Sequence, residues 1–184
     1  KGSQSGAWEF FHYNGQSRLT GNYVGGLKSG KWTQSNEKGE ALGGSELSAP
    51  GTGTYSEWHD NGNKALEQKL QAGNVVGEVR YRADGTKDFQ VSYNEAGQRS
   101  GTFQAWAVDG KTLVAKYEYK EGRKEGSQTE WYSTGAKKRD AQYKDYYKTG
   151  EWTDYYPSAR VQKTRHYVEG RRQGNWLSHY DNEA

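Results

Sequence analysis

The chain has 184 residues, a formal net charge of +3, 7 Trp and 15 Tyr, and neither Cys nor Met. Few aliphatic residues would favour disorder if the net charge were high, but this charge is small and the aromatic side chains can bury large areas. The lack of Cys excludes a disulfide framework, a thiol nucleophile and thiolate metal ligands. No apolar run approaches the length of a membrane-spanning helix.

A unit of about 24 residues recurs from one end of the chain to the other, and such a period is the mark of a repeat architecture. Most copies have an aromatic residue two positions after an opening glycine, as in Trp8, Trp32 and Trp152, and a turn glycine further on. We therefore predict a single repeat domain over residues 1–184, with copies that open at Gly6, Gly30, Gly53, Gly77, Gly101, Gly126, Gly150 and Gly174.

Each copy has the pattern of a β-hairpin. Its first half alternates aromatic and polar residues, and its middle holds a pair such as Asn14-Gly15 that tolerates the positive φ of a tight turn. No stretch shows helical periodicity. The sequence therefore predicts an all-β fold, an elongated, twisted antiparallel sheet of about seven to eight consecutive hairpins.

Several copies depart from the pattern. The second breaks down at Gly43-Gly44-Ser45 and Pro50-Gly51, which predicts an irregular loop at about residues 40–52. The fourth lacks one residue, which we assign to a shorter hairpin turn. The sixth has Gln128 where other copies have an aromatic residue, and in the seventh Ala159 replaces the turn glycine.

The aromatic residues found five positions after the opening glycine are candidates for partner binding. They have the opposite parity to the Trp column, so a regular strand would place the two columns on opposite faces, whereas a β-bulge would bring them together. Tyr and Trp are favoured anchors of interfaces, but the same residues also serve internal packing. The candidates, with two adjacent tyrosines, are Phe11, Trp58, Trp106, Trp131, Tyr132, Tyr155 and Tyr156. The 40–52 segment is a second candidate.

Residue patterns for catalysis are missing. His12 and His59 occupy the same position two copies apart, roughly 19 Å, which is too far for a shared metal ion. No Ser or Lys lies in a nucleophile motif, and the Gly-rich stretches fall in repeat turns rather than before a helix. We therefore expect a protein that is not an enzyme, without catalytic, cofactor-binding or metal-binding residues.

The phrase Gly-x-Trp-x-x-Tyr-Tyr-x-x-Gly, followed by Tyr-x-x-Gly-x-x-x-Gly, resembles the MORN-variant repeat. It is clearest in residues 6–30, 126–150 and 150–174. The resemblance covers the chain except for about residues 40–52, and it implies a series of β-hairpins in one antiparallel sheet. Bacterial proteins with such repeats include antitoxins and immunity proteins, some acting against phospholipases secreted by the type VI system, and others are membrane-associated scaffolds.

The resemblance and the lack of catalytic groups lead us to expect an immunity or antitoxin protein that blocks a cognate toxin through its sheet surface. The alternative is a membrane- or phospholipid-associated scaffold, because residues 137–172 carry 10 basic and 5 acidic side chains. Nucleic-acid binding is a distant third expectation, and the oligomeric state is left open. Because the chain lacks Met, we expect that a leader was removed and that the protein is periplasmic or attached to the cell envelope, with the cytoplasm as the alternative.

Overall fold

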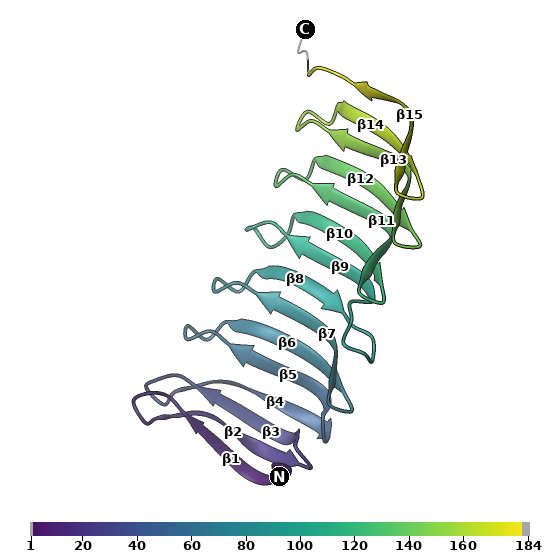
Figure 1. Ribbon diagram of the computed structural model, residues 1–184. Helices are drawn as coiled ribbons and strands as arrows, with labels where there is room; N and C mark the ends of the chain where they lie inside the picture. Colours follow the sequence, from purple (N-terminus) through teal and green to yellow (C-terminus); the bar gives the residue numbers. More distant parts are fainter. Residues whose placement is uncertain (1, 182–184) are drawn as a thin grey trace. The chain divides into compact units, whose positions relative to one another are not determined.

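The computed structural model describes residues 2–181, and their regular structure consists of β-strands alone. The strand order in the sheet is the sequence order, β1 to β15, and the described pairs are antiparallel (Figure 1). This confirms the predicted all-β class of consecutive hairpins. The chain divides into two compact units; the first ends at Lys87 and includes Glu95–Gly97, and the second takes Asp88–Asn94 and the chain from Gln98 onward.

The first unit holds seven strands. They are β1 (Gly6–Phe11), β2 (Ser17–Val24), β3 (Leu27–Ser35), β4 (Ala41–Ala49), β5 (Thr52–Trp58), β6 (Lys64–Gln71) and β7 (Asn74–Tyr81). The second unit holds the remaining strands, apart from the first residue of β8. They are β8 (Lys87–Ser92), β9 (Gly101–Trp106), β10 (Leu113–Lys120), β11 (Arg123–Trp131), β12 (Lys137–Lys144), β13 (Tyr147–Tyr155), β14 (Val161–Val168) and β15 (Arg171–Ser178).

The Gly-x-Trp motif forms a wide bulge inside the strand. Thr20 pairs with Thr33 and Asn22 pairs with Ser29, so β3 has two more residues than β2 between these pairs. Gly30, within the bulge, has a φ of 62°, which residues with a Cβ rarely adopt. The bulge places Trp32 above Gly21 of the preceding strand, where a Cβ on Gly21 would lie 2.1 Å from the indole ring. The opening glycine is thus a bulge residue that lets the tryptophan cover its neighbour.

The turns at the end of most copies are two-residue loops in which both residues have positive φ, the pattern of a type I′ turn. Gly25-Gly26, Ala72-Gly73, Glu121-Gly122 and Glu169-Gly170 follow this pattern with glycine second. The predicted turns in the middle of each copy also have the expected positive φ at glycine. Ala159, which replaces one of these glycines, has a φ of 65°.

The fourth copy loses its residue in the bulge, and the prediction of a shorter hairpin turn is wrong. Arg82 N–H bonds Thr86 O and Gly85 N–H bonds Arg82 O, the same two bonds that His12, Gln16 and Gly15 make in the first copy. Between β6 and β7 the bulge contains only one extra residue, and Gly77 pairs in register with Lys69. Tyr81, and not Arg82, is therefore the counterpart of the position-five aromatic residues.

The predicted irregular loop at residues 40–52 is also wrong, because residues 41–49 form β4. Gly43 and Gly44 pair with Gln34 and Thr33 in an ordinary ladder. A Cβ on Gly43 would lie 2.2 Å from the Trp58 ring, so the glycine leaves space for a tryptophan of the next strand. Glycines that suggest a loop in the sequence are required here by close packing within a sheet.

The Trp column and the position-five column lie on opposite sides of β13. Trp152 and Asp154 share a side, because Asp154 bonds Arg139 and Arg165 and Arg165 is the cross-strand partner of Trp152. Tyr155 lies on the other side, where its hydroxyl donates to Asp140 at 3.3 Å. A bulge does occur beside Tyr155, but its extra residue belongs to β14 and leaves the alternation of β13 intact. For this copy, the expectation of opposite faces holds.

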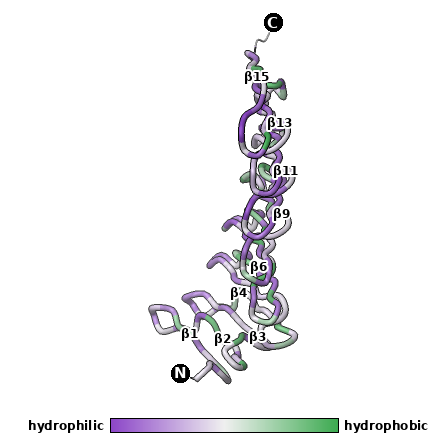
Figure 2. Tube along the Cα trace, turned by 45° about the vertical axis from the view of Figure 1, so that its right-hand side comes forward, coloured by the Kyte–Doolittle hydropathy of each residue, from purple (hydrophilic) through white to green (hydrophobic). Residues whose placement is uncertain are grey.

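The aromatic face of each unit carries a small core. In the first unit Trp32, Leu47 and Tyr55 are buried, with Phe10, Leu19, Tyr23 and Leu70 packed around them. In the second unit Ala141, Trp152 and Tyr167 are buried beside Tyr143. Hydrophobic and hydrophilic residues alternate along the chain without a long hydrophobic run (Figure 2). The fold therefore depends on rings stacked from strand to strand.

Candidate binding surface

The seven predicted binding residues come from five hairpins, and the structure gives most of them internal contacts. Trp58 packs on Gly43, and its backbone N–H and C=O bond both ends of the Gln34 amide at 3.1 and 2.9 Å. Trp106, Trp131 and Tyr155 are half-buried. Phe11, with 57% of its surface exposed, is the most open of the candidates. The position-five column is therefore in large part scaffold.

Tyr132 and Tyr156 link successive copies. Their hydroxyls donate to Tyr155 O and His179 O, each at 2.8 Å and one copy further on. His12 and His59 occupy the same position in other copies and contact Ser35 O at 2.8 Å and Tyr81 O at 3.1 Å. Tyrosine and histidine thus have the same role at this position: each connects its hairpin to the next one through a backbone carbonyl. Their shared position in the repeat could have suggested this role.

A second recurring feature, a row of cations, was missed in the sequence. Lys28, Lys124, Lys148 and Arg172 are the cross-strand partners of Tyr23, Tyr119, Tyr143 and Tyr167, and Arg99 bridges to Tyr93. Each of these tyrosines is followed five or six residues later by its cation, a spacing that can be read from the sequence. Where Leu70 replaces the tyrosine, its partner is the uncharged Val75.

Four of these cations, Lys28, Arg99, Lys124 and Lys148, lie over aromatic rings. The Lys28 Nζ is 3.4 Å from the centre of the Tyr55 ring, and the Lys148 Nζ is 4.6 Å from that of Trp152. Burial lowers the pKa of Lys28 to about 8 despite the attraction of Glu57, and burial also lowers the pKa of Lys124. Burial, with a hydrogen bond to Glu130, raises the pKa of Tyr117 well above its ordinary value. This face thus combines aromatic rings with partly desolvated charges.

The most unusual turn of the repeat lies between β12 and β13. We call Asp145, Tyr146 and Tyr147 the tyrosine turn. Tyr146 has a φ of 72° at the second turn position, which is glycine in the four type I′ turns described above. Such a conformation costs a residue with a Cβ roughly 1–2 kcal/mol. The Arg123 guanidinium lies 4.6 Å from the Tyr146 ring, and the Tyr146 hydroxyl donates to Glu121 at 3.3 Å.

This turn is also attached differently to the preceding copy. The N–H groups of Gly122 and Gly170 bond the backbone carbonyls of Arg99 and Lys148 at 2.8 and 2.9 Å. The N–H of Tyr146 instead reaches the Glu125 carboxylate at 3.4 Å. A strained residue held by long side-chain contacts in place of a backbone bond is a reasonable candidate for a functional position.

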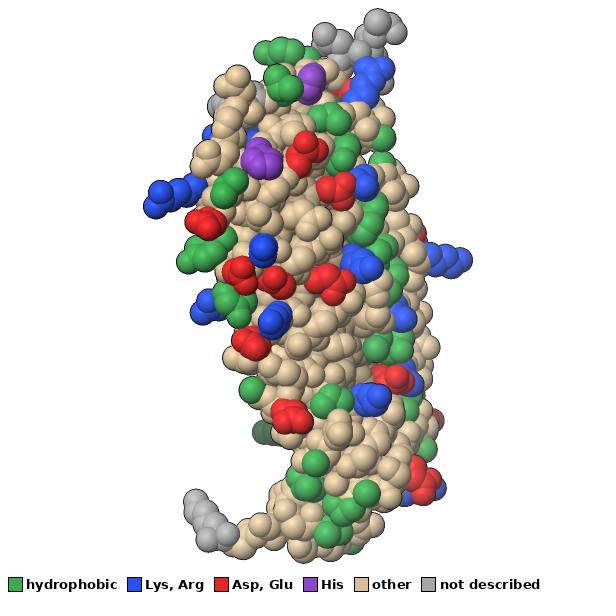
Figure 3. All heavy atoms as spheres, turned by 90° about the vertical axis from the view of Figure 1, so that its right-hand side faces the viewer, with side chains coloured by type: hydrophobic (Ala, Val, Ile, Leu, Met, Phe, Trp, Pro, Cys, Tyr) green, Lys and Arg blue, Asp and Glu red, His purple; other side chains and the backbone are tan. Residues whose placement is uncertain are grey.

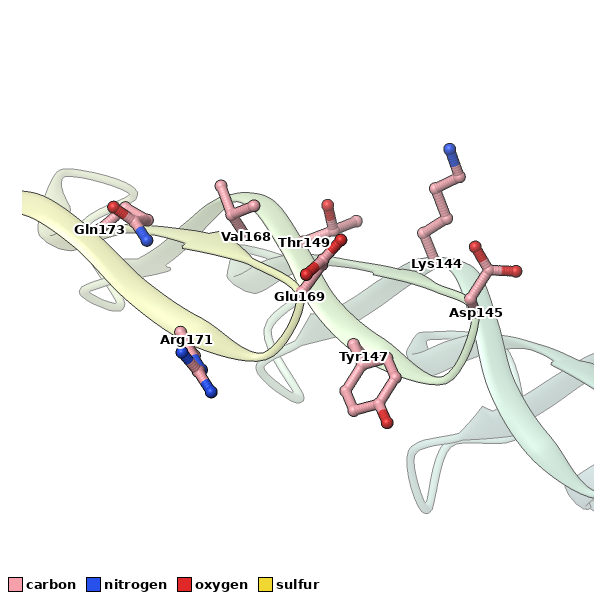
Figure 4. Close-up of a pocket in the computed structure, with 8 residues that line it drawn as sticks. All are labelled: Lys144, Asp145, Tyr147, Thr149, Val168, Glu169, Arg171 and Gln173. Atoms are coloured by element: carbon pink, nitrogen blue, oxygen red, sulfur yellow. The ribbon is translucent and has the colours of Figure 1, made fainter.

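The tyrosine turn borders a shallow cleft of about 840 Å³ between it and the β14–β15 turn. Tyr147 and Val168 are 59% and 46% exposed, and Tyr147 packs near Gly170 of the adjacent turn. Figure 4 shows Tyr147 and Arg171 projecting in a similar direction from successive turns. The cleft is lined by Lys144, Asp145, Tyr147, Thr149, Val168, Glu169, Arg171 and Gln173.

The charges at the cleft are balanced, because its lining includes two basic residues, Lys144 and Arg171, and two acidic residues, Asp145 and Glu169. Acidic and basic side chains are also interspersed over the side of the molecule seen in Figure 3. Exposed tyrosines with an arginine and charges of both signs are typical of a protein-binding surface.

Among residues 2–181 there is no cluster of three or more His, Asp or Glu side chains arranged to hold a metal ion. The same residues include no helix long and apolar enough to cross a membrane. In comparisons with known proteins, no protein-family model matches the sequence, and no curated protein matches it significantly.

Proposed function

We propose that this protein binds a bacterial toxin and neutralises it, as an immunity protein does, with the tyrosine turn as part of the interface. The observation that carries the proposal is Tyr146, which occupies a glycine position at positive φ and remains 38% exposed. A residue that costs stability and is open to solvent is best explained by a contact outside the chain. The toxin role itself depends on the resemblance to MORN-variant repeats, and a secreted phospholipase is the target class it favours.

The mechanism is steric occlusion. Tyr146, Tyr147 and Val168 would insert into an apolar recess of the toxin, and the charges of both signs at the cleft would fix the orientation. The repeat provides a rigid support, because side-chain and backbone bonds connect successive hairpins at both edges. A toxin held in this way would lose access to its substrate.

A membrane-associated scaffold is less well supported by this surface. Binding to anionic lipid requires an excess of Lys and Arg, whereas the tyrosine turn and its cleft carry charges of both signs. We therefore favour a protein partner over an anionic membrane.

The test is to co-purify this protein with the product of any secreted-toxin gene beside its own and to measure toxin activity with and without it. We expect a stoichiometric complex and a loss of activity that follows its formation. If the products of all such adjacent genes neither bind nor are inhibited, the toxin role is wrong.

A matched pair of variants tests the surface. Tyr147→Ser should weaken the complex at least about tenfold, as expected for an interface anchor. Tyr13→Ser removes a fully exposed tyrosine from a turn of the first unit and should leave affinity unchanged. Equal effects of the two substitutions would argue against the tyrosine turn as the interface.

A further inference from the structure

The cation row of the second unit suggests a binding track that is separate from the tyrosine turn. Lys124, Lys148 and Arg172 lie on β11, β13 and β15, and Arg99 lies just before β9, so each hairpin of this unit supplies one cation. Lys148 and Tyr147 are adjacent on β13, so their side chains leave on opposite sides. The row therefore lies on the aromatic face, and its function does not depend on the proposed toxin role.

Three of the four cations lie beside aromatic rings. The Arg99 guanidinium lies 5.6 Å from both Phe103 and Tyr119, and the Lys124 Nζ lies 4.0 Å from Tyr117. Lys148 similarly contacts Trp152 and Tyr167. Contacts with rings restrict side-chain motion and leave the ammonium or guanidinium only partly hydrated, so less free energy is lost when an anion binds.

Carboxylates on this face already have partners. Asp154 accepts hydrogen bonds from Arg139 and Arg165. Glu130 accepts one from the Tyr117 hydroxyl at 2.7 Å and lies 3.8 Å from Arg139. The turns beyond the row carry charges of both signs, with Lys120, Lys144 and Arg171 close to Glu121, Asp145 and Glu169. A single row of cations, one for each hairpin, suits a linear anion better than a broad anionic surface.

The spacing of the row indicates the kind of linear anion. Cations on alternate strands recur about every 9.6 Å, twice the distance between neighbouring strands. A polyproline II peptide rises about 3.1 Å per residue and has three residues per turn, so every third side chain recurs on one side at about 9.3 Å. Tyrosine-lined surfaces are also a common docking site for this conformation.

We propose that the row Arg99, Lys124, Lys148 and Arg172 binds an extended acidic peptide in the polyproline II conformation, with a carboxylate at every third residue. The peptide crosses the strands of the second unit, and each carboxylate meets the cation of one hairpin. Its prolines or aliphatic residues pack on the tyrosines beside the cations. A proline-rich acidic segment of a partner protein would have this chemistry.

The experiment compares two fluorescently labelled peptides of the same composition by anisotropy. One repeats Glu-Pro-Pro, and the other carries all of its Glu at one end. The intact protein should bind the periodic peptide at least about threefold more tightly, a difference expected from a few weak ion pairs. Equal affinities would show attraction by charge alone and would overturn the proposal.

Substitutions test whether the preference for the periodic peptide comes from the cation row. Lys124→Gln combined with Lys148→Gln should abolish the preference, and Lys124→Arg with Lys148→Arg should retain it, which separates the loss of charge from a general loss of structure. Lys120→Gln with Lys138→Gln removes two lysines of the same strand pairs from the other face and should leave the peptide preference unchanged. Loss of the preference in that control would contradict the proposal, as would tighter binding of oligothymidylate or anionic vesicles than of the periodic peptide.

Discussion

At the scale of single residues, two facing residues on adjacent strands share one packing space, so a large side chain on one strand goes with a small one on the other. Gly21 lies under Trp32, and Ala141 and Trp152 belong to the same buried cluster. In the sixth copy the large residue is Tyr117, and its cross-strand partner is Gln128. The Gln128 Nε2 donates to Glu118 O at 2.9 Å, as the Trp152 Nε1 donates to Gln142 O at 3.1 Å. Gln128 thus replaces the hydrogen-bond donor of the tryptophan, and Tyr117 supplies the bulk.

Gly21→Ala should destabilise the protein by about 2–3 kcal/mol, because the new methyl group would overlap the Trp32 ring. The matched control is Gly2→Ala, where no atom lies within 4 Å of the added Cβ. Denaturant unfolding measures both changes. An unchanged unfolding midpoint for Gly21→Ala would show that Trp32 does not pack as described.

Tyr146→Gly should have opposite effects on stability and function. Relief of the positive φ should stabilise the fold by about 0.5–1 kcal/mol, after subtraction of the lost contact with Arg123. Affinity for the toxin should fall. A less stable variant would mean that Tyr146 is kept for packing, and an unchanged affinity would remove it from the interface.

At the scale of the hairpin, the sequence predicted the repeat period, the turns and the alternation, because each of these leaves a local pattern. It failed where residues from different copies meet. Gly43 and Gly44 suggested a loop because Trp58, which fills the space above Gly43, is one copy away. Tyr132 and Tyr156 suggested a binding site because the carbonyls they bond lie in the next hairpin. The strain at Tyr146 was missed, although the equivalent position is glycine in other copies, as at Gly122 and Gly170.

Burial of Lys28 should make the free energy of unfolding depend on pH. The pKa of Lys28 falls from 10.5 to about 8 on folding, so between these values the unfolded chain binds more protons than the folded one. The free energy of unfolding should therefore rise as the pH increases from 8 to 10. Above pH 10 the raised pKa of Tyr55 acts in the opposite direction, because the unfolded tyrosine loses its proton first.

Lys28→Met should reduce this rise, which is measured as the urea midpoint at pH 8 and pH 10. Lys31→Met, three residues further along β3 and on its other face, serves as the control and should retain the rise. An identical pH dependence in all three proteins would show that Lys28 keeps its ordinary pKa in the fold.

At the scale of the whole molecule, contacts are almost entirely between strands that are neighbours in sequence, with β3 and β5 as an additional pair. Stability in such an array is a sum of local terms and nearest-neighbour terms. A destabilising substitution in one hairpin should therefore affect only the strands near it.

Hydrogen exchange of Gly21→Ala can measure this range. Amides of β1 to β4 should exchange faster, whereas amides of β12 to β14 should be much less affected. A uniform loss of protection along the chain would show that the protein unfolds as one cooperative unit.

The most direct test of the proposed interface is hydrogen exchange of the complex with the neighbouring-gene toxin. We expect new protection at residues 144–149 and 168–173, around the tyrosine turn and its cleft, and little change at the opposite edge of the same hairpins, residues 132–136 and 156–160. Protection confined to that opposite edge, or to the first unit, would contradict the assignment of the tyrosine turn as the toxin-binding surface.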